Sequence, residues 1–170
     1  QRKHDQARGR QDQIPLTLDQ VTPNNLTLML RSSRTISEST VVISFDSSPF
    51  AVGEGLASMM FRLSNIKYAG GAGPCSMILK FAPFKYYEAL LGYKYIFKGL
   101  GTMFLEAMSY HDQMPQRYGV DTPAAYFAAY DDDLMETILI MEDLTPWKCL
   151  DQTAGVSSYA EAELSLTTIA

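Results

Sequence analysis

Two glycines and a lysine in the first half of the chain have the types and spacing of a phosphate site. Gly53 and Gly55 are separated by one residue, Ser58 follows three positions later, and Lys80 ends an apolar run. Glycines let backbone groups approach phosphate oxygens closely, and a lysine ammonium supplies a positive point charge. The combination predicts a nucleotide-phosphate site. Taken alone, the glycines are more typical of a plain hairpin turn, and the lysine of a solvated strand edge.

A glutamate in a predicted helix could act together with this lysine. Apolar residues recur at helical spacing over residues 102–114, and Glu106 lies inside their stripe, which consists of Met103, Ala107, Tyr110 and Met114. A buried carboxylate without a partner is very costly. Two alternatives remain open: Glu106 pairs with a cation, for which we expect Lys80 within ion-pair reach, or Glu106 lies at the edge of the stripe and reaches solvent.

Three strands are predicted to position these side chains. They cover residues 41–45, 60–68 and 76–81, and a glycine-rich turn at 70–74 joins the last two. Period-two alternation puts Phe61 and Leu63 on the face opposite Arg62 and Ser64, and it puts Met77, Leu79 and Phe81 on the face opposite Ile78 and Lys80. Lys80 is therefore expected beside an apolar sheet face.

Two more strands are predicted over residues 124–130 and 137–141. Asp131, Asp132 and Asp133 stand between them and predict a solvated hairpin turn. Three consecutive acids could suggest a metal site, but adjacent side chains point in different directions, so we expect no metal site here. Residues 82–101 give no firm assignment, and a loop with some helix is the interpretation that we adopt for them.

The two ends of the chain carry different signals. Residues 1–13 are polar and locally basic, which predicts a disordered tail. Thr22 and Pro23 predict the start of a helix whose apolar stripe is Leu26, Met29 and Leu30. Ser158 and Glu161 form a capping box, and the helix that it predicts reaches Ala170 without a stop signal. We expect this last helix to belong to an incomplete further lobe.

Composition limits the class of protein. The chain has 170 residues, 46% of them hydrophobic, and a net charge of −5, which argues against non-specific nucleic-acid binding. No apolar run is long enough to span a bilayer. The two cysteines, Cys75 and Cys149, are widely separated and form no ligand motif. We therefore expect a reduced, cytoplasmic protein that binds neither nucleic acid nor membrane.

The order of these parts resembles the N-terminal lobe of the kinase-like fold, and more closely the aminoglycoside phosphotransferase superfamily, in particular its ecdysteroid-kinase-like branch. The resemblance covers roughly residues 16–170. The matching motifs are Gly53-x-Gly55-x-x-Ser58, Arg62-Leu63, Gly73-Pro74-x-Ser76, Leu79-Lys80, Leu105-Glu106 with Tyr110, Pro123-x-x-Tyr126, Ile140-Met141-Glu142-Asp143-Leu144, and Asp151-Gln152 with Gly155-x-Ser157. It implies an α+β fold with a five-stranded antiparallel sheet and a glutamate-bearing helix. Residues 14–144 would form the nucleotide-binding lobe, and residues 145–170 would form the linker and the first helix of the next lobe.

The resemblance also implies roles for individual residues. Lys80 would hold the α- and β-phosphates of ATP and pair with Glu106, while the loop of Gly53, Gly55 and Ser58 would cover the triphosphate. Two more groups would meet the base: Met141 near the gatekeeper position, and the backbone of Glu142 and Leu144 at the adenine edge. The cofactors would be ATP and Mg²⁺, with the magnesium ligands beyond Ala170, and the acceptor would be a small hydroxylated molecule.

The chain departs from the family in one respect that concerns catalysis. The family's catalytic loop, His-x-Asp-x-x-x-x-Asn, is absent, because the only histidines are His4 and His111 and no asparagine follows Asn65. We therefore expect the nucleotide-binding part of an ATP-dependent small-molecule kinase that is inactive by itself. The alternatives are a non-catalytic pseudokinase or ligand-binding module, and an unrelated antiparallel-sheet domain with an incidental glycine hairpin.

Overall fold

The computed structural model describes most of the sheet and two helices of this chain. The described residues are 15, 17–50, 58–82, 102–113, 117–119, 122–131, 136–145 and 159–160. Their elements are η2 (Leu18–Gln20), α2 (Pro23–Ser32), β1 (Val41–Pro49), β2 (Met59–Ala69), β3 (Met77–Ala82), α5 (Thr102–His111), β4 (Ala125–Asp131) and β5 (Glu136–Glu142). The predictions for the basic tail, for Gly53 and Gly55, and for the helix that begins near Ser158 concern residues outside these ranges, apart from 159–160, which are helical.

The strands form one five-stranded antiparallel sheet in the order β1-β2-β3-β5-β4. Strand β5 lies between β3 and β4, so the last strand in the sequence is internal and β4 is at an edge. Together with the helices this confirms the expected α+β class and the five antiparallel strands. No helix among the described residues is long and apolar enough to cross a membrane.

Helix α2 covers one face of the sheet. Thr22 caps it as expected, because its Oγ1 accepts a hydrogen bond from the Asn25 N–H at 3.2 Å. The predicted stripe of Leu26, Met29 and Leu30 is buried in the main hydrophobic core. The strands contribute the remaining buried residues of that core, among them Leu63, Met77, Leu79, Phe81, Ile138 and Ile140. Alternation therefore predicted the core face of β2 and β3 correctly.

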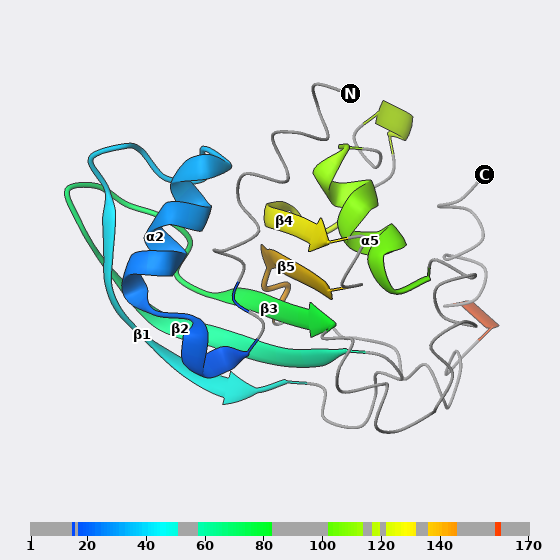
Figure 1. Cartoon of the computed structure of the whole chain (residues 1–170), viewed down its shortest axis with the longest axis horizontal. Helices are drawn as coiled ribbons and strands as arrows, with labels where there is room; N and C mark the ends of the chain where they lie inside the picture. Colours follow the sequence, from blue (N-terminus) through cyan, green and yellow to red (C-terminus); the bar gives the residue numbers. More distant parts are fainter. Residues whose placement is uncertain are drawn as a thin grey trace.

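Helix α5 packs against the opposite face. Its Tyr110 contacts a second cluster of buried residues, which consists of Ile78, Leu139 and Met141. Figure 1 shows α2 beside β1 at one end of the curved sheet and α5 beside β4 and β5 at the other. Because Lys80 follows Ile78 by two residues in β3, its side chain belongs to the α5 face.

Two predictions about element ends were wrong. Strand β1 continues to Pro49 instead of ending at Phe45, because β2 supplies ladder partners as far as Phe61 while the polar side chains of Asp46 and Ser47 stay exposed at the sheet edge. Helix α5 ends at His111 rather than at residue 114, and Gln113 then has a positive φ of 56°.

The prediction of a solvated turn was also wrong at Asp131. This residue is the last of β4, lies opposite Glu136 in the antiparallel ladder and is only 6% exposed. Sequence reasoning took three consecutive acids as a polar turn, whereas cross-strand pairing extends β4 into the first of them. Asp132 and Asp133 lie outside the described residues.

The turn at 70–74 was predicted correctly, and its geometry requires glycine. Gly70 has a φ of +74°, and a Cβ placed there would lie 2.2 Å from the carbonyl oxygen of Ser39. Tyr68 closes the same turn by donating its hydroxyl to the carbonyl of Pro74 at 2.8 Å.

Candidate functional site

The predicted lysine–glutamate contact is present. Nζ of Lys80, on β3, lies 2.5 Å from Oε2 of Glu106, on α5. The Lys80 side chain is 25% exposed and the Glu106 side chain is 43% exposed. Glu106 therefore combines the two alternatives left open by the sequence, since it pairs with a cation and also reaches solvent. The pair fixes the ammonium at the boundary between sheet and helix, where it remains accessible to an anion.

A largely buried apolar cluster adjoins this ion pair on the same sheet face. The buried cluster of Ile78, Leu139 and Met141 has Phe50 and Met60 packed against it. Met60 is the ladder partner of Lys80, and Met141 is the ladder partner of Ile78. A charged group therefore borders an apolar cluster, a combination that occurs in many small-molecule binding sites.

The segment after β5 adds backbone groups to one edge of this cluster. The Glu142 N–H donates to the carbonyl of Ala124 at 2.8 Å, and the Glu142 Oε2 accepts from the Ala124 N–H at 3.1 Å. The Glu142 N–H is therefore already used within the protein, so of its two backbone groups only the carbonyl is left to be considered for a ligand. Leu144 is 41% exposed, and the described residues provide no hydrogen-bond partner for its N–H.

A second charged cluster, which sequence reasoning missed, lies beside this segment. Arg62 Nη2 donates to Thr145 Oγ1 at 2.7 Å, and its guanidinium lies 4.7 Å from the centre of the Phe50 ring. Arg62 Nε is buried, and it lies 2.9 Å from Asp143 Oδ2 at an angle outside that of a regular hydrogen bond. The sequence alternation put Arg62 on the face opposite Phe61 and Leu63 but gave no signal for its partners.

The Asp143 carboxylate is held in its ionised form. Burial by itself raises its pKa, but hydrogen bonds from Thr145 and Ser76 and the nearby charge of Arg62 oppose this, so that the pKa lies below its ordinary value. The side chain is only 5% exposed. Asp143 is therefore a structural anion of the segment after β5, not an acid that exchanges protons near neutral pH.

The structure brings together only part of the predicted site. Lys80, Glu106 and Met141 lie on the α5 face, and the 142–144 segment follows directly. Ser58 precedes β2 and stands two residues before Met60, the ladder partner of Lys80. Gly53 and Gly55 are outside the described residues. No three His, Cys, Asp or Glu side chains converge as metal ligands within the described ranges.

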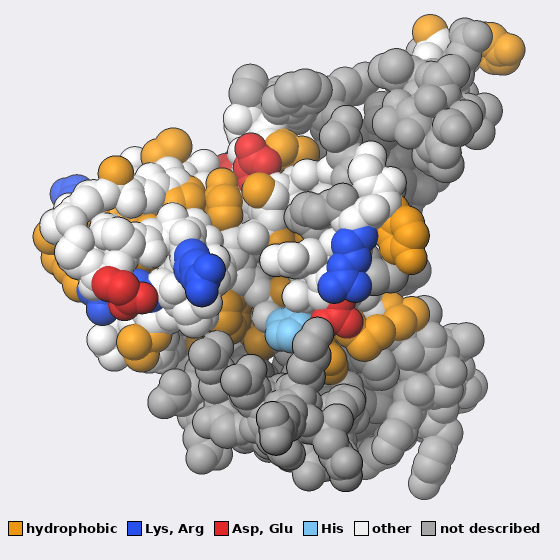
Figure 2. Space-filling view, turned by 90° about the horizontal axis from the view of Figure 1, so that it is seen from above, with side chains coloured by type: hydrophobic (Ala, Val, Ile, Leu, Met, Phe, Trp, Pro, Cys, Tyr) orange, Lys and Arg blue, Asp and Glu red, His pale blue; other side chains and the backbone are white. Residues whose placement is uncertain are grey.

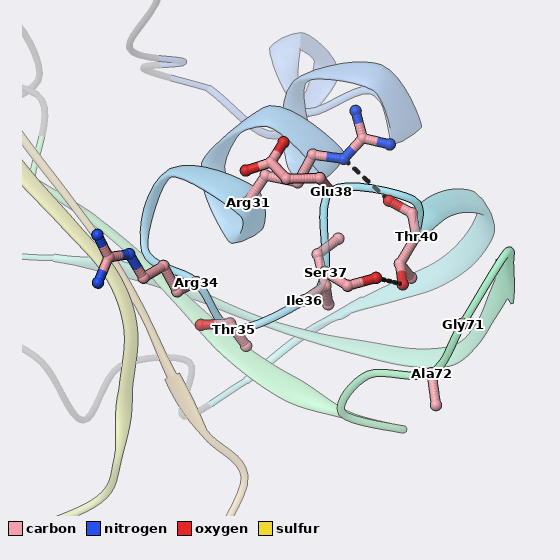
Figure 3. A pocket seen from close by; sticks show the side chains of 9 residues that line it. All are labelled: Arg31, Arg34, Thr35, Ile36, Ser37, Glu38, Thr40, Gly71 and Ala72. Carbon is pink, nitrogen blue, oxygen red and sulfur yellow. Dashed lines mark hydrogen bonds between the residues drawn. The ribbon is translucent and has the colours of Figure 1, made fainter.

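A separate hollow of about 560 Å³ lies between the end of α2 and the 70–74 turn. Arg31 and Arg34 are among the residues that line it, and Arg31 Nε donates to the carbonyl of Thr40 at 3.0 Å (Figure 3). None of the predicted site residues lines this hollow. Figure 2 shows acidic and basic side chains dispersed over the visible described surface rather than gathered into a patch of one sign.

Comparison with models of protein families, with curated proteins and with solved structures finds no match for this chain.

Proposed function

We propose that this chain provides the nucleotide-binding part of an ATP-dependent phosphotransferase that acts on a hydroxyl group of a small molecule. The observation that carries the proposal is the Lys80–Glu106 ion pair beside an apolar sheet face. Glu106 would hold the Lys80 ammonium in a fixed direction, and the ammonium would bind the α- and β-phosphate oxygens. Gly53, Gly55 and Ser58 would cover the phosphates with backbone groups.

The base would lie against the apolar part of the same face. Met60 of β2 is partly exposed, whereas Ile78 of β3 and Met141 of β5 are 4% and 9% exposed, so the base would contact mainly Met60, with Ile78 and Met141 behind it. The Glu142 carbonyl would accept a hydrogen bond from the exocyclic amine of adenine, and the Leu144 N–H would donate to a ring nitrogen. The Glu142 N–H donates to the Ala124 carbonyl, which supports these two roles. The Glu142 carbonyl is then the acceptor, and the Leu144 N–H the donor, for the base edge.

The rest of the phosphotransferase machinery is not assigned to residues of this chain. ATP supplies the γ-phosphoryl group when it is bound, and no cluster of metal ligands among the described residues fits Mg²⁺. The sequence also contains no His-x-Asp-x-x-x-x-Asn. The ion pair and the apolar cluster would equally serve a second candidate, a module that binds a nucleotide without transferring phosphate.

Calorimetric titration of the full chain with ATP, with adenosine and with tripolyphosphate tests the proposal. A site with a base half and a phosphate half binds all three ligands, and ATP competes with each of the other two. If ATP gives no saturable heat at millimolar concentration, the nucleotide site is wrong and the second candidate fails with it. If tripolyphosphate alone binds, the lysine side is supported and the base side is rejected.

A further inference from the structure

We propose that Arg62 is a positioning residue that holds the 142–144 segment and the end of β1 against β2, and so fixes the two walls between which the base would bind. This inference rests on the proposed nucleotide site. It adds a residue to the base half of that site, whereas Lys80 and Glu106 belong to the phosphate half.

The sheet order explains why such a residue is needed. Strand β2 is hydrogen-bonded to β1 and β3, and β3 separates it from β5. Adjacent strands lie about 4.8 Å apart, so β2 and the end of β5 are about 10 Å apart and share no backbone bond. Arg62 stands opposite Ile78, which stands opposite Met141. Its side chain therefore extends across β3, along this row, to residues that follow β5.

Both carboxylate oxygens of Asp143 have partners, and one of these partners is Arg62. Oδ2 lies 2.9 Å from Arg62 Nε, while Oδ1 accepts the Thr145 N–H at 3.1 Å and the Thr145 hydroxyl at 2.7 Å. Thr145 Oγ1 in turn accepts from Arg62 Nη2. The three side chains form a closed network, which we call the Arg62 clamp. Leu144 lies inside the turn that this network closes, so the clamp determines where the Leu144 N–H points.

Phe50 connects the clamp to the other wall. Its ring lies under the Arg62 guanidinium at 4.7 Å and packs against the cluster of Ile78, Leu139 and Met141. Its N–H donates to the Met60 carbonyl at 2.9 Å, which holds the end of β1 on β2. Stacking of a guanidinium on an aromatic ring is favourable and depends on the planar group that arginine has and lysine lacks. In sequence, Phe50 precedes the glycines that would cover the phosphates.

The first test measures the position of the segment in the full chain without any ligand. In Arg62→Met the aliphatic stem remains but the charge and the donors are lost. We expect the ¹⁵N order parameters of Leu144 and Thr145 to fall from about 0.85 to below about 0.6, with that of Ile140 in β5 unchanged. The control is Arg31→Met, which removes a guanidinium that donates to the Thr40 carbonyl instead, and it should leave all three order parameters unchanged. Unaltered order at 144 and 145 in folded Arg62→Met overturns the proposal.

The second test separates positioning from general stability by comparing ligands. Arg62→Met should weaken adenosine binding about tenfold, a loss of about 1.4 kcal/mol, and leave tripolyphosphate binding within about twofold. Arg62→Lys should restore only part of the adenosine affinity, because it keeps the charge and loses the planar fork. Equal weakening of both ligands, or full rescue by lysine, overturns the positioning role.

The proposed function and the clamp fail in distinguishable ways. If the unmodified chain binds neither adenosine nor ATP, the nucleotide site is rejected, and the order parameters alone decide whether Arg62 positions the segment. If Arg62→Met does not fold, Arg62→Lys and Thr145→Val serve in both tests. Thr145→Val removes the hydroxyl contacts of the network and keeps the ion pair, and it should loosen residue 144 less than loss of the arginine does.

Discussion

Lys80 and Glu106 form an ion pair between β3 and α5, with Nζ and Oε2 separated by 2.5 Å although the residues are 26 positions apart in the sequence. The pair stands at the edge of the Ile78, Leu139 and Met141 cluster, and both side chains keep contact with solvent. In a fully buried ion pair the ammonium would be inaccessible to a ligand. The Lys80 side chain is partly exposed, so part of its ammonium is available to an anion. We therefore expect the pair to orient the Lys80 ammonium more than to stabilise the fold.

Removing the lysine charge should weaken nucleotide binding. Lys80→Ala is expected to lower ATP affinity at least about tenfold, because the ammonium is the only cation assigned to the phosphates. Lys67→Ala is the matched control, since it removes a strand lysine seven positions along β2 from the ladder partner of Lys80. Calorimetric titration of both variants with ATP checks the prediction. Equal ATP affinity in Lys80→Ala and the unmodified chain would remove Lys80 from the site.

The ion pair should contribute little to folding stability. A double-mutant cycle with Lys80→Met and Glu106→Gln is expected to give a coupling free energy of about 0.2–1 kcal/mol, because solvent screens a partly exposed pair. Urea unfolding of the four proteins provides the measurement. A coupling above about 2 kcal/mol would mean that the pair is a structural element of the core and not a directional one.

The Glu142 side chain should contribute to the free energy of unfolding and not to ATP affinity. Glu142→Gln keeps an oxygen that accepts the Ala124 N–H and should change neither stability nor ATP affinity. Glu142→Ala loses this hydrogen bond and should reduce the free energy of unfolding by about 1 kcal/mol, again with unchanged ATP affinity. Titration and urea unfolding report the two quantities separately. A tenfold loss of affinity in Glu142→Gln would show that the side chain binds the ligand.

Alkaline pH should destabilise the fold through Tyr68. Burial, followed by the charges of Cys75 and Tyr126, raises the pKa of Tyr68 from 10.0 to about 12. An unfolded tyrosine ionises near its ordinary pKa, so the stabilisation present below pH 10 is lost as the pH rises toward about 12. Tyr68→Phe should be less stable than the unmodified chain at pH 8, because the hydrogen bond to Pro74 is gone, and the difference should narrow by pH 11.5. Unfolding curves at the two pH values check this, and a constant difference would contradict it.

The chain alone should transfer no phosphate. Transfer requires an oriented acceptor hydroxyl and charge neutralisation at both the attacking and the leaving oxygens. Lys80 and the glycines would serve only the leaving side, and the sequence contains no His-x-Asp pair followed by asparagine. An assay of ADP release with ATP, Mg²⁺ and a panel of hydroxylated acceptors provides the measurement. Acceptor-dependent turnover would show that this chain contains a base that we have not identified.

The sequence by itself determined the features that depend on near neighbours. Period-two alternation gave the two faces of β3, because successive strand side chains must point in opposite directions. Thr22 and Pro23 gave the start of α2, because a capping hydroxyl and a fixed φ act within one turn. The Lys80–Glu106 contact was predicted from the inward-facing positions of both residues together with a resemblance in the order of parts, since nothing local brings residue 80 to residue 106.

Only the tertiary structure decided the features that depend on pairing across the chain. It placed β5 beside β3, extended β1 to Pro49, and buried Asp131 opposite Glu136, where three acids in a row had indicated solvent. It also brought Arg62 to Thr145, which is 83 positions away in the sequence. An arginine on a strand can donate hydrogen bonds to many acceptors, and the order of the strands determines which acceptors lie within its reach. The sequence fixes which face a side chain occupies, and the order of strands across the sheet fixes which residue it meets there.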